Sequence, residues 1–375
     1  MNKEINAVLI HENKMMEIMN KALNRANKIL DKIYGRLDNR SIEVLMDEEL
    51  EKHLKHGNKT ILYIGIRYDY GNKDWGLSYE HYNFYHTLLN MDYSLIYFDY
   101  DRIKQKYGNK KMSEMLREVV YYYQPDILFY YHYHDRIAHD IWKEISKELP
   151  TKTIIGLGDD HWRYEETRPV WELFNLVVTT DEKGYERRKK EGFGNVFLSQ
   201  WACNHFMYKN LNLPRIYDIT FVGQPYGKRA EVIEKLKKRG INVTVFGRGW
   251  KNTNIAPSQS EFIRIYNQSK ICLNMQYASV GSSMQLKGKD FLAPGCGSLL
   301  LTNDTEQIKK YFTPGEEIIT YKDANDAAEK IKYYLKNEDE RERIAQKGYE
   351  RVMREHTYEK RFSEIFDFAQ NIEVE

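Results

Sequence analysis

Glycine and basic residues recur where short apolar runs end in the segment from Asp218 to Thr302. The runs are Ile219–Val222, Val243–Phe246, Ile271–Met275 and Ser298–Thr302. Strands of a parallel sheet are buried on both faces, so they appear in a sequence as continuous apolar runs. Ligands of such sheets bind at the carboxyl ends of the strands, where glycine lets a phosphate approach the backbone and a cation offsets its charge. Several such ends in one segment predict a site for a nucleotide-type ligand.

Basic residues in this segment are candidates for binding a diphosphate. Gly223 ends the first run and Arg229 opens the helix that follows, an arrangement that favours phosphate over a plain turn with a solvated Arg. Lys287 and Lys289 flank Gly288 just before another apolar run. Fixed cations there would stabilise a departing diphosphate without a metal, although both lysines could also be solvated surface residues.

The stretch from Gly247 to Trp250 is too short for a dinucleotide fingerprint, which needs G-x-G-x-x-G at the start of a helix. Its glycines would instead leave room for a nucleotide base. Trp250 either lines that pocket or packs against the core of the domain.

The elements that carry these residues form two series of alternating strands and helices. Strands are expected at Ile61–Ile66, Ser94–Phe98, Ile127–Tyr131, Thr153–Leu157, Leu176–Thr179 and Asn195–Phe197, and a second series begins at Ile219 and ends with Glu317–Thr320. Such alternation predicts an α/β fold with two tandem Rossmann-like, doubly wound parallel-sheet domains. We expect a helical extension over residues 1–58, domains over 59–213 and 214–355, and a C-terminal helix over 356–375 that packs back on the first domain.

The second half resembles the CgeB-like group of glycosyltransferases of the GT-B superfamily. The resemblance rests on Thr220–Gly223 with Arg229, Gly247–Trp250, Ser269–Ile271 with Leu273-Asn274, Lys287–Leu292 with Pro294 and Cys296-Gly297, and Glu355–Tyr358 with Arg361. It is strong over about residues 215–365, weaker over 59–205, and does not include residues 1–58. It implies the GT-B fold, a ligand cleft between the domains, and donor binding by the second domain. The implied donor site includes Asn274 and Gly297 besides the glycines, Trp250 and the cations above.

The chain departs from this family pattern at two positions. Lys289 stands where the family usually has Arg, and Leu292 stands where it has a Glu that commonly holds the ribose of the donor. Asp290 is a nearby carboxylate that could take over the contact with the ribose.

In the first half, polar and aromatic residues follow the expected strand ends. Gly65 leads into a loop with Asp69, Asp74 and Trp75, residue types that stack on sugar rings or bind hydroxyls, so this loop is a candidate acceptor site. His134 and Asp160 lie in polar clusters after two later strands. An acceptor hydroxyl needs a general base if the enzyme inverts, and we expect Asp160 in that role with His134 as a sugar or phosphate contact. Glu80-His81 is the next candidate, and structural polar loops are the alternative.

Composition limits the other possibilities. Lys and Arg total 57 against 55 acids, for a net charge of +2, which argues against a dedicated nucleic-acid binder. Three widely spaced cysteines indicate neither a disulfide framework nor a zinc cluster. The polar start contains no signal peptide, and no apolar run is long enough for a membrane span, so a cytoplasmic protein is expected. An amphipathic seam over residues 15–37 predicts either a helix on the domain's own surface or a homodimer contact.

The sequence therefore predicts a metal-independent glycosyltransferase without a cofactor. It would move a sugar from a nucleotide-diphosphate donor, UDP-linked by expectation, to a protein or cell-surface glycan acceptor. A degenerate GT-B module that binds a sugar nucleotide or glycan without turnover is the alternative, and an epimerase of GT-B architecture is a third possibility. The sugar, the acceptor and the retained or inverted outcome do not follow from the sequence.

Overall fold

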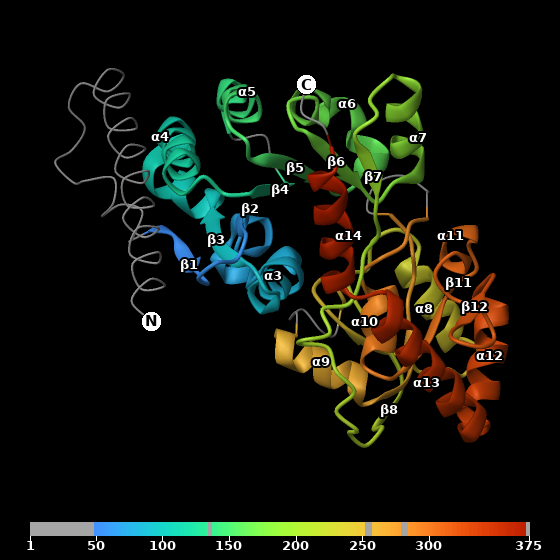
Figure 1. The fold of residues 1–375 in the computed structure, drawn as a ribbon. Helices are drawn as coiled ribbons and strands as arrows, with labels where there is room; N and C mark the ends of the chain where they lie inside the picture. Colours follow the sequence, from blue (N-terminus) through green and yellow to red (C-terminus); the bar gives the residue numbers. More distant parts are fainter. Residues whose placement is uncertain (1–48, 134–136, 252–256, 279–283, 373–375) are drawn as a thin grey trace, which may run out of the picture. The chain divides into compact units, whose positions relative to one another are not determined.

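The chain forms two compact units (Figure 1). The computed structural model describes residues 49–133, 137–251, 257–278 and 284–372. The first unit contains the chain up to Glu80, Asp92–Phe197 and the residues from Phe368; the second contains His81–Met91 and Leu198–Asp367. The expected helix over residues 15–37, and with it the predicted dimer contact, lies outside the described residues.

The first unit is built on a sheet with strand order β1-β3-β2-β4-β5-β6-β7 in the described part of the chain. Its strands are β1 (Glu51–His53), β2 (Thr60–Gly65), β3 (Ser94–Asp99), β4 (Ile127–His132), β5 (Lys152–Leu157), β6 (Leu176–Thr179) and β7 (Val196–Leu198). Its helices are η1 (Asp69–Gly71), η2 (Lys73–Trp75), α4 (Tyr100–Tyr123), α5 (His139–Glu148), α6 (Asp160–Trp171) and α7 (Glu182–Lys190). The strands from β2 to β6 pair in parallel, as expected for a doubly wound sheet.

Alternate residues of the strands face two different layers. Leu62, Ile64 and their counterparts on the neighbouring strands share a buried core with α4, α5 and α6. On the opposite face, the Tyr63 ring stacks on Tyr97 and Phe129, with ring centroids 5.5 and 5.7 Å apart. Both faces are therefore buried, which explains why these strands appear in the sequence as continuous apolar runs.

The segment before the first long strand was predicted wrongly. The expected helical extension reached residue 58, but Glu51–His53 forms β1 and pairs antiparallel with β3. The polar triplet has no apolar alternation, and its strand conformation comes from backbone pairing at the edge of the sheet. Helix α4 begins at Tyr100, where Asp99 caps it, and Gly108, at φ +82, lies at a kink between its two helical stretches.

The second unit holds a parallel sheet with strand order β12-β11-β10-β8-β9 among the described residues. Its strands are β8 (Tyr217–Val222), β9 (Thr244–Phe246), β10 (Ser269–Leu273), β11 (Leu299–Asn303) and β12 (Ile319–Tyr321). Its helices are η3 (His81–Tyr85), α3 (His86–Asn90), α8 (Arg229–Lys237), α9 (Gln259–Asn267), α10 (Lys289–Gly295), α11 (Glu306–Lys309), α12 (Ala324–Lys336) and α13 (Glu338–Glu355). Helix α14 (Tyr358–Gln370) begins in this unit and ends in the first. One face of the sheet shares its core with α8, α12 and α13.

The division between the units lies ahead of the predicted boundary at residues 213 and 214. The stretch after Leu198 bonds to the second unit: the Cys203 N–H donates to the His356 carbonyl at 2.9 Å, and the Leu211 N–H donates to Asn267 Oδ1 at 2.6 Å. The segment His81–Met91 also groups with this unit, where Phe84 packs on Tyr358. These contacts join residues distant in sequence, so no local pattern could reveal them.

In the late motif Glu355–Tyr358, the buried His356 forms a polar joint, defined here as its two contacts with the Tyr311 carbonyl and Arg361. His356 Nε2 lies 2.8 Å from the Tyr311 carbonyl oxygen, and its Nδ1 lies 3.1 Å from Arg361 Nη2. A neutral ring that donates from Nε2 and accepts at Nδ1 satisfies both contacts, whereas a protonated ring would meet the guanidinium with two charges. Burial, with Arg361 and Arg351, lowers the pKa of His356 to about 4.

We expect acid to weaken this joint. The folded pKa of His356 lies below its unfolded value of 6.5, so the unfolded chain binds more protons between pH 6.5 and about 4. The free energy of unfolding should therefore fall across this window by up to roughly 3 kcal/mol. Denaturant titrations at pH 7.5 and 4.5 measure this fall, and His356→Gln, whose amide can replace both contacts, should flatten it. An equal fall in the variant would assign the acid sensitivity to other groups.

Candidate functional site

Two glycines meet where β8 and β9 end in the second unit. Gly223 has φ +154 and Gly247 has φ +129, conformations that L side chains rarely adopt. A Cβ added at Gly247 would lie 2.7 Å from the Gly223 carbonyl oxygen, so the two loops touch through their backbones. A side chain at Gly223 would meet Lys289 Nζ. The structure thus brings together two of the predicted donor-binding glycines and one predicted cation.

Lys289 lies against this turn with its ammonium group held by backbone. Its Nζ donates to the Val222 carbonyl and lies 5.5 Å from the centroid of the Phe221 ring. Burial lowers its pKa well below the usual range, and repulsion from Arg229 and Lys287 lowers it further, while Asp290 acts in the opposite direction. A cation that burial and two like charges disfavour would gain from an anion placed beside it.

Arg229 has a more structural setting than the sequence indicated. Its side chain is 1% exposed and donates to the carbonyls of Gln224 at 3.2 Å and Met275 at 2.9 Å. The guanidinium lies 3.6 Å from the centroid of the Tyr226 ring. Arg229 therefore braces the turn after β8 and adds positive charge beneath it, and Nε is its buried donor without a partner among the described residues.

Trp250 follows the packing alternative rather than an open pocket wall. Its Nε1 donates to the Gly223 carbonyl at 2.7 Å, and its ring meets Phe221 edge-on with centroids 5.9 Å apart. The indole fixes the backbone of the glycine turn, so its effect on a ligand acts through that turn.

Asp290 is the buried anchor of the site rather than a surface carboxylate. Its Oδ1 accepts from Asn274 Nδ2 at 2.6 Å and from Thr302 Oγ1 at 2.8 Å. Its Oδ2 accepts from the Lys287 N–H at 2.9 Å and from Gln276 Nε2 at 3.2 Å. Burial raises the pKa of this carboxyl, and the same hydrogen bonds lower it. The carboxylate ties the ends of β10 and β11 to the start of α10.

This placement corrects the expectation that Asp290 could hold a ribose. The residue is fully buried and both carboxylate oxygens are already bonded, so neither can reach a ligand. Asn274 belongs to the same buried layer, since its amide group serves Asp290 and its carbonyl accepts from Tyr321. Leu292 is buried as well and offers no hydrogen-bonding group.

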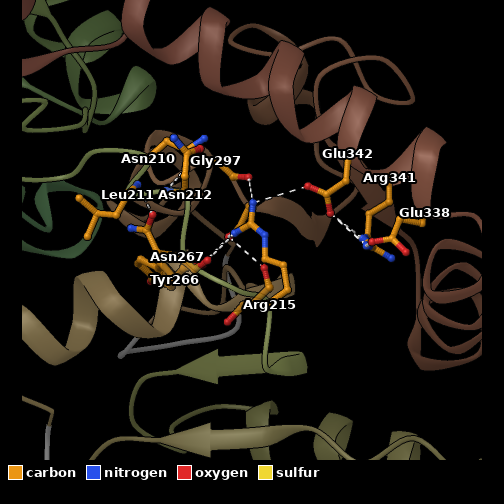
Figure 2. A network of polar contacts seen from close by, with 12 residues as sticks. Asn210, Leu211, Asn212, Arg215, Tyr266, Asn267, Gly297, Glu338, Arg341 and Glu342 are labelled. Atoms are coloured by element: carbon orange, nitrogen blue, oxygen red, sulfur yellow. Dashed lines mark hydrogen bonds and ion pairs between the residues drawn. The ribbon is translucent and has the colours of Figure 1, made fainter.

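Gly297 lies just before β11, at the amino ends of the parallel strands, whereas Gly223 and Gly247 lie at the carboxyl ends. This position corrects the assignment of Gly297 to the donor site. Its carbonyl accepts from Arg215 Nη2 at 2.5 Å, in the polar network that Figure 2 shows. Arg215 Nη1 also donates to the Asn267 carbonyl at 2.7 Å and to Ser298 Oγ at 2.8 Å. A Cβ at Gly297 would meet Asn210 at 2.7 Å, so a glycine at this position makes room for the Asn210 side chain. The family motif at this position is structural.

The loop after β2 in the first unit is short and ordered by its own bonds. The Asp69 N–H donates to the Gly76 carbonyl at 2.9 Å, and Asn72 caps η2 through the Asp74 N–H at 2.9 Å. Trp75 is 46% exposed and meets the ring of Tyr70 with centroids 5.6 Å apart. The predicted acceptor loop therefore presents an aromatic pair, and the Asp74 N–H is taken by the side chain of Asn72.

Glu80 is the carboxyl group of this unit that stands out electrostatically. Its pKa is raised to about 7, chiefly by burial and then by the charges of Asp69 and Asp159, against the lowering effect of its own backbone N–H and the Ser78 hydroxyl. The sequence ranked Glu80 behind Asp160 and His134 because those two follow strand ends and lie in polar clusters flanked by aromatic residues. Only the tertiary structure brings Asp69 and Asp159, from two different loops, close to Glu80.

Asp160 does not project from the domain as expected. Both its oxygens accept from Arg188, at 2.6 and 3.0 Å, and Thr179 Oγ1 donates to Oδ2 at 2.6 Å. Asp160 and Arg188 are buried together, with the guanidinium 4.5 Å from the ring centroids of Tyr164 and Trp171. This is a buried bidentate ion pair with no free oxygen for an acceptor proton, so its placement corrects the assignment as base. His134 lies outside the described residues.

Neither metal ligation nor a membrane span emerges from the described ranges. In them, no group of three or more His, Cys, Asp or Glu side chains is arranged to hold a metal ion. Within the same ranges, every helix is too short or too polar to cross a bilayer.

Comparison with known proteins gives matches of three kinds. A family model described as glycosyl transferase-like matches residues 228–367. The spore protein CgeB of Bacillus subtilis (strain 168) is 22% identical over 252 residues, covering 60% of this chain and 77% of that protein. These two matches confirm the CgeB-like resemblance and the presence of a glycosyltransferase domain.

Solved structures share the fold at low identity. Sucrose-phosphate synthase from Thermosynechococcus elongatus superposes with a TM-score of 0.58 at 13% identity, covering 82% of this chain and 98% of that one. HepE of Anabaena, in complex with UDP and glucose, gives a TM-score of 0.54 at 9% identity, covering 82% and 99%. The chain therefore has the GT-B fold that the sequence predicted.

We expect Asp160 to matter for folding before it matters for chemistry. Asp160→Asn leaves the buried Arg188 without its counter-charge, which should cost roughly 3–5 kcal/mol of unfolding free energy. Asp159→Asn, a change of the same type at the half-exposed neighbour, is the matched control and should cost far less. Urea unfolding of both variants makes the comparison. A folded and normally stable Asp160→Asn that has lost transfer activity would restore Asp160 as a catalytic candidate.

Proposed function

We propose, for this CgeB-like glycosyltransferase of GT-B fold, that the second unit binds the diphosphate of a nucleotide sugar and the enzyme moves that sugar to an acceptor hydroxyl. The observation that carries the proposal is the convergence of Lys289, Arg229 and Lys287 at the glycine turn after β8. Asp290 is one carboxylate beside these three cations, so positive charge is in excess there. A diphosphate supplies the missing negative charge.

The same arrangement suits the chemistry of transfer. As the bond from the sugar to the diphosphate breaks, negative charge grows on the leaving oxygens, and fixed cations stabilise that charge without reorganising. The glycines at positions 223 and 247 let the two strand ends touch, with the Gly223 N–H bonded to the Phe246 carbonyl at 2.8 Å, and leave space beside the Lys289 ammonium group. We infer a UDP-linked donor, an inference supported by the HepE complex with UDP and glucose. The acceptor is proposed to be a protein or a cell-surface glycan precursor.

Removing the cations should weaken donor binding. Lys289→Ala and Lys287→Ala are each expected to cost roughly 1–3 kcal/mol, or about 5- to 150-fold in Kd for UDP-glucose measured by calorimetry. Affinity should also fall as pH rises, because deprotonation of Lys289 removes its charge. Lys270→Ala, which removes a lysine paired with Asp218 elsewhere in this unit, is the matched control. Wild-type affinity for UDP and UDP-glucose in both site variants would refute this placement of the donor. Arg229→Ala is less informative, since it also removes two bonds that brace the turn.

We expect transfer to proceed without a divalent metal. In the proposal, the charge of the leaving diphosphate is met by Lys289, Lys287 and Arg229, which do the work that a metal does in other transferases. Turnover of UDP-glucose in EDTA should equal turnover with Mg²⁺ or Mn²⁺ added. Activity that disappears in EDTA and returns with either ion would contradict the proposal.

A donor panel separates transfer from binding alone. Each nucleotide sugar that raises the melting temperature by mass action is then tested for release of nucleotide. Binding without release would favour the alternative of a module that recognises a sugar nucleotide without turnover.

A further inference from the structure

The ring of Phe221, on β8, is the place where charged groups of the glycine turn meet. Its centroid lies 5.5 Å from the Lys289 ammonium nitrogen and 5.6 Å from the guanidinium carbon of Arg229. Trp250 meets the same ring edge-on, with centroids 5.9 Å apart. The face of an aromatic ring attracts a cation that lies within about 6 Å of its centroid. Phe221 therefore attracts two of the three cations to which the diphosphate is assigned.

The Lys289 ammonium group has few partners besides this ring. An ammonium group has three N–H donors, and in the part of the chain that the structure describes the Val222 carbonyl is its one hydrogen-bond acceptor. Burial and then the charges of Arg229 and Lys287 lower the pKa of this group, and the opposing effect of Asp290 is smaller. Two N–H donors are therefore left for a ligand, and the ring adds attraction that the charged form otherwise lacks.

Packing around Gly223 brings the ring and the ammonium group to the same point. A Cβ added at Gly223 would meet Lys289 Nζ and would lie 3.3 Å from the Phe221 ring. Trp250 Nε1 donates to the Gly223 carbonyl at 2.7 Å, so the indole that touches the ring also holds the turn. Phe221 itself is fully buried. The ring, the glycine and the ammonium group therefore form one contact cluster at the end of β8.

Core packing alone does not require an aromatic residue at this position. The other members of the core that Phe221 joins are mostly aliphatic, among them Ile219, Leu273 and Leu301. An aliphatic side chain buries apolar surface as an aromatic one does, but it has no negative face for a cation. The two roles of the ring can therefore be separated by changing its charge distribution while keeping its shape.

We propose that Phe221 is a positioning residue of the donor site, whose ring holds the Lys289 ammonium group at the end of β8 in its charged form, with two N–H donors left for a diphosphate. The inference rests on the proposed binding of a nucleotide sugar by the second unit. The ring acts through Lys289 and does not touch the ligand. It favours the charge on a partly buried lysine that burial and like charges disfavour, so the site stays cationic before a ligand binds.

Fluorination of the ring tests this role, because each fluorine weakens the negative face of the ring while its shape stays nearly the same. Mono-, di- and trifluorinated phenylalanine are introduced at position 221 of the full chain, and the titration of Lys289 is followed by NMR of isotope-labelled lysine. Lys289→Gln identifies the signal. At a fixed pH within the titration, the ratio of charged to neutral Lys289 should fall with each fluorine, by about 2- to 30-fold over the series, which matches the usual strength of a cation–π contact.

The same fluorinated residues at position 366 are the matched control. Phe366 is a fully buried phenylalanine of the same unit whose ring stacks on Phe362, with centroids 5.7 Å apart, and there the series should leave the Lys289 titration unchanged. Phe221→Leu removes the ring face altogether and should lower the pKa of Lys289 about as far as trifluorination does, with the melting temperature as the check of folding. A Lys289 signal that titrates alike in every fluorinated protein overturns the inference, whether or not the protein binds UDP.

Calorimetry with UDP connects the ring to the proposed function. Affinity for UDP should fall as pH rises, and each fluorine at position 221 should move that fall to lower pH. In Lys289→Ala the same fluorination should change Kd less than about twofold, since the ammonium group is absent. A fluorine effect that persists there belongs to Arg229 or to packing, and it overturns the role of the ring in holding Lys289. Wild-type protein that binds no UDP refutes the proposed function, and the Lys289 titration then still decides whether the ring holds the ammonium group.

Discussion

The buried carboxylate of Asp290 is the interaction on which the proposed donor site depends. It accepts hydrogen bonds from side chains after β10 and on β11 and from the backbone that leads into α10. A charge removed from water must be met by such bonds, and meeting them fixes the spacing of the elements that supply them. Lys289 directly precedes Asp290 in the chain. The buried Asp290 carboxylate therefore also places the Lys289 ammonium group against the end of β8. The carboxylate never touches the ligand in this account; it determines where the cations stand.

The fold therefore holds positive charge at the end of β8 in an unfavourable environment. Burial and like charges disfavour the ammonium form of Lys289, and Arg229 is buried beneath the turn. Functional sites often hold ionisable groups in such unfavourable settings, because the ligand then provides the compensation that the protein does not. In the first unit the charged form of a carboxyl is disfavoured instead: burial, followed by the charges of Asp69 and Asp159, raises the pKa of Glu80.

Other charged side chains stabilise the fold, because their polar atoms are bonded to groups within the protein. Asp160 with Arg188, and Arg215 with the carbonyls of Asn267 and Gly297, are nearly saturated with partners. Charged groups that stabilise the fold differ from candidate functional groups in how many of their polar atoms already have hydrogen-bond or ion-pair partners. A carboxylate whose two oxygens are bonded to one guanidinium has little capacity left, whereas Glu80 and Lys289 are surrounded by like charge. Residue type and position after a strand could not separate the two kinds.

The sequence by itself determined where the strands lie and that they form parallel sheets. It also determined that glycines and basic residues follow strand ends in the second half. Continuous apolar runs are a direct consequence of burial on both faces of a sheet, so β2–β12 were found within a few residues. The choice among polar residues was decided only by tertiary structure, because it depends on which side chains meet across loops and strands. Asp160 and Gly297 are bonded within the structure, and the polar triplet Glu51–His53 forms an edge strand. In each case a partner distant in the chain sets the environment, and no local pattern records that partner.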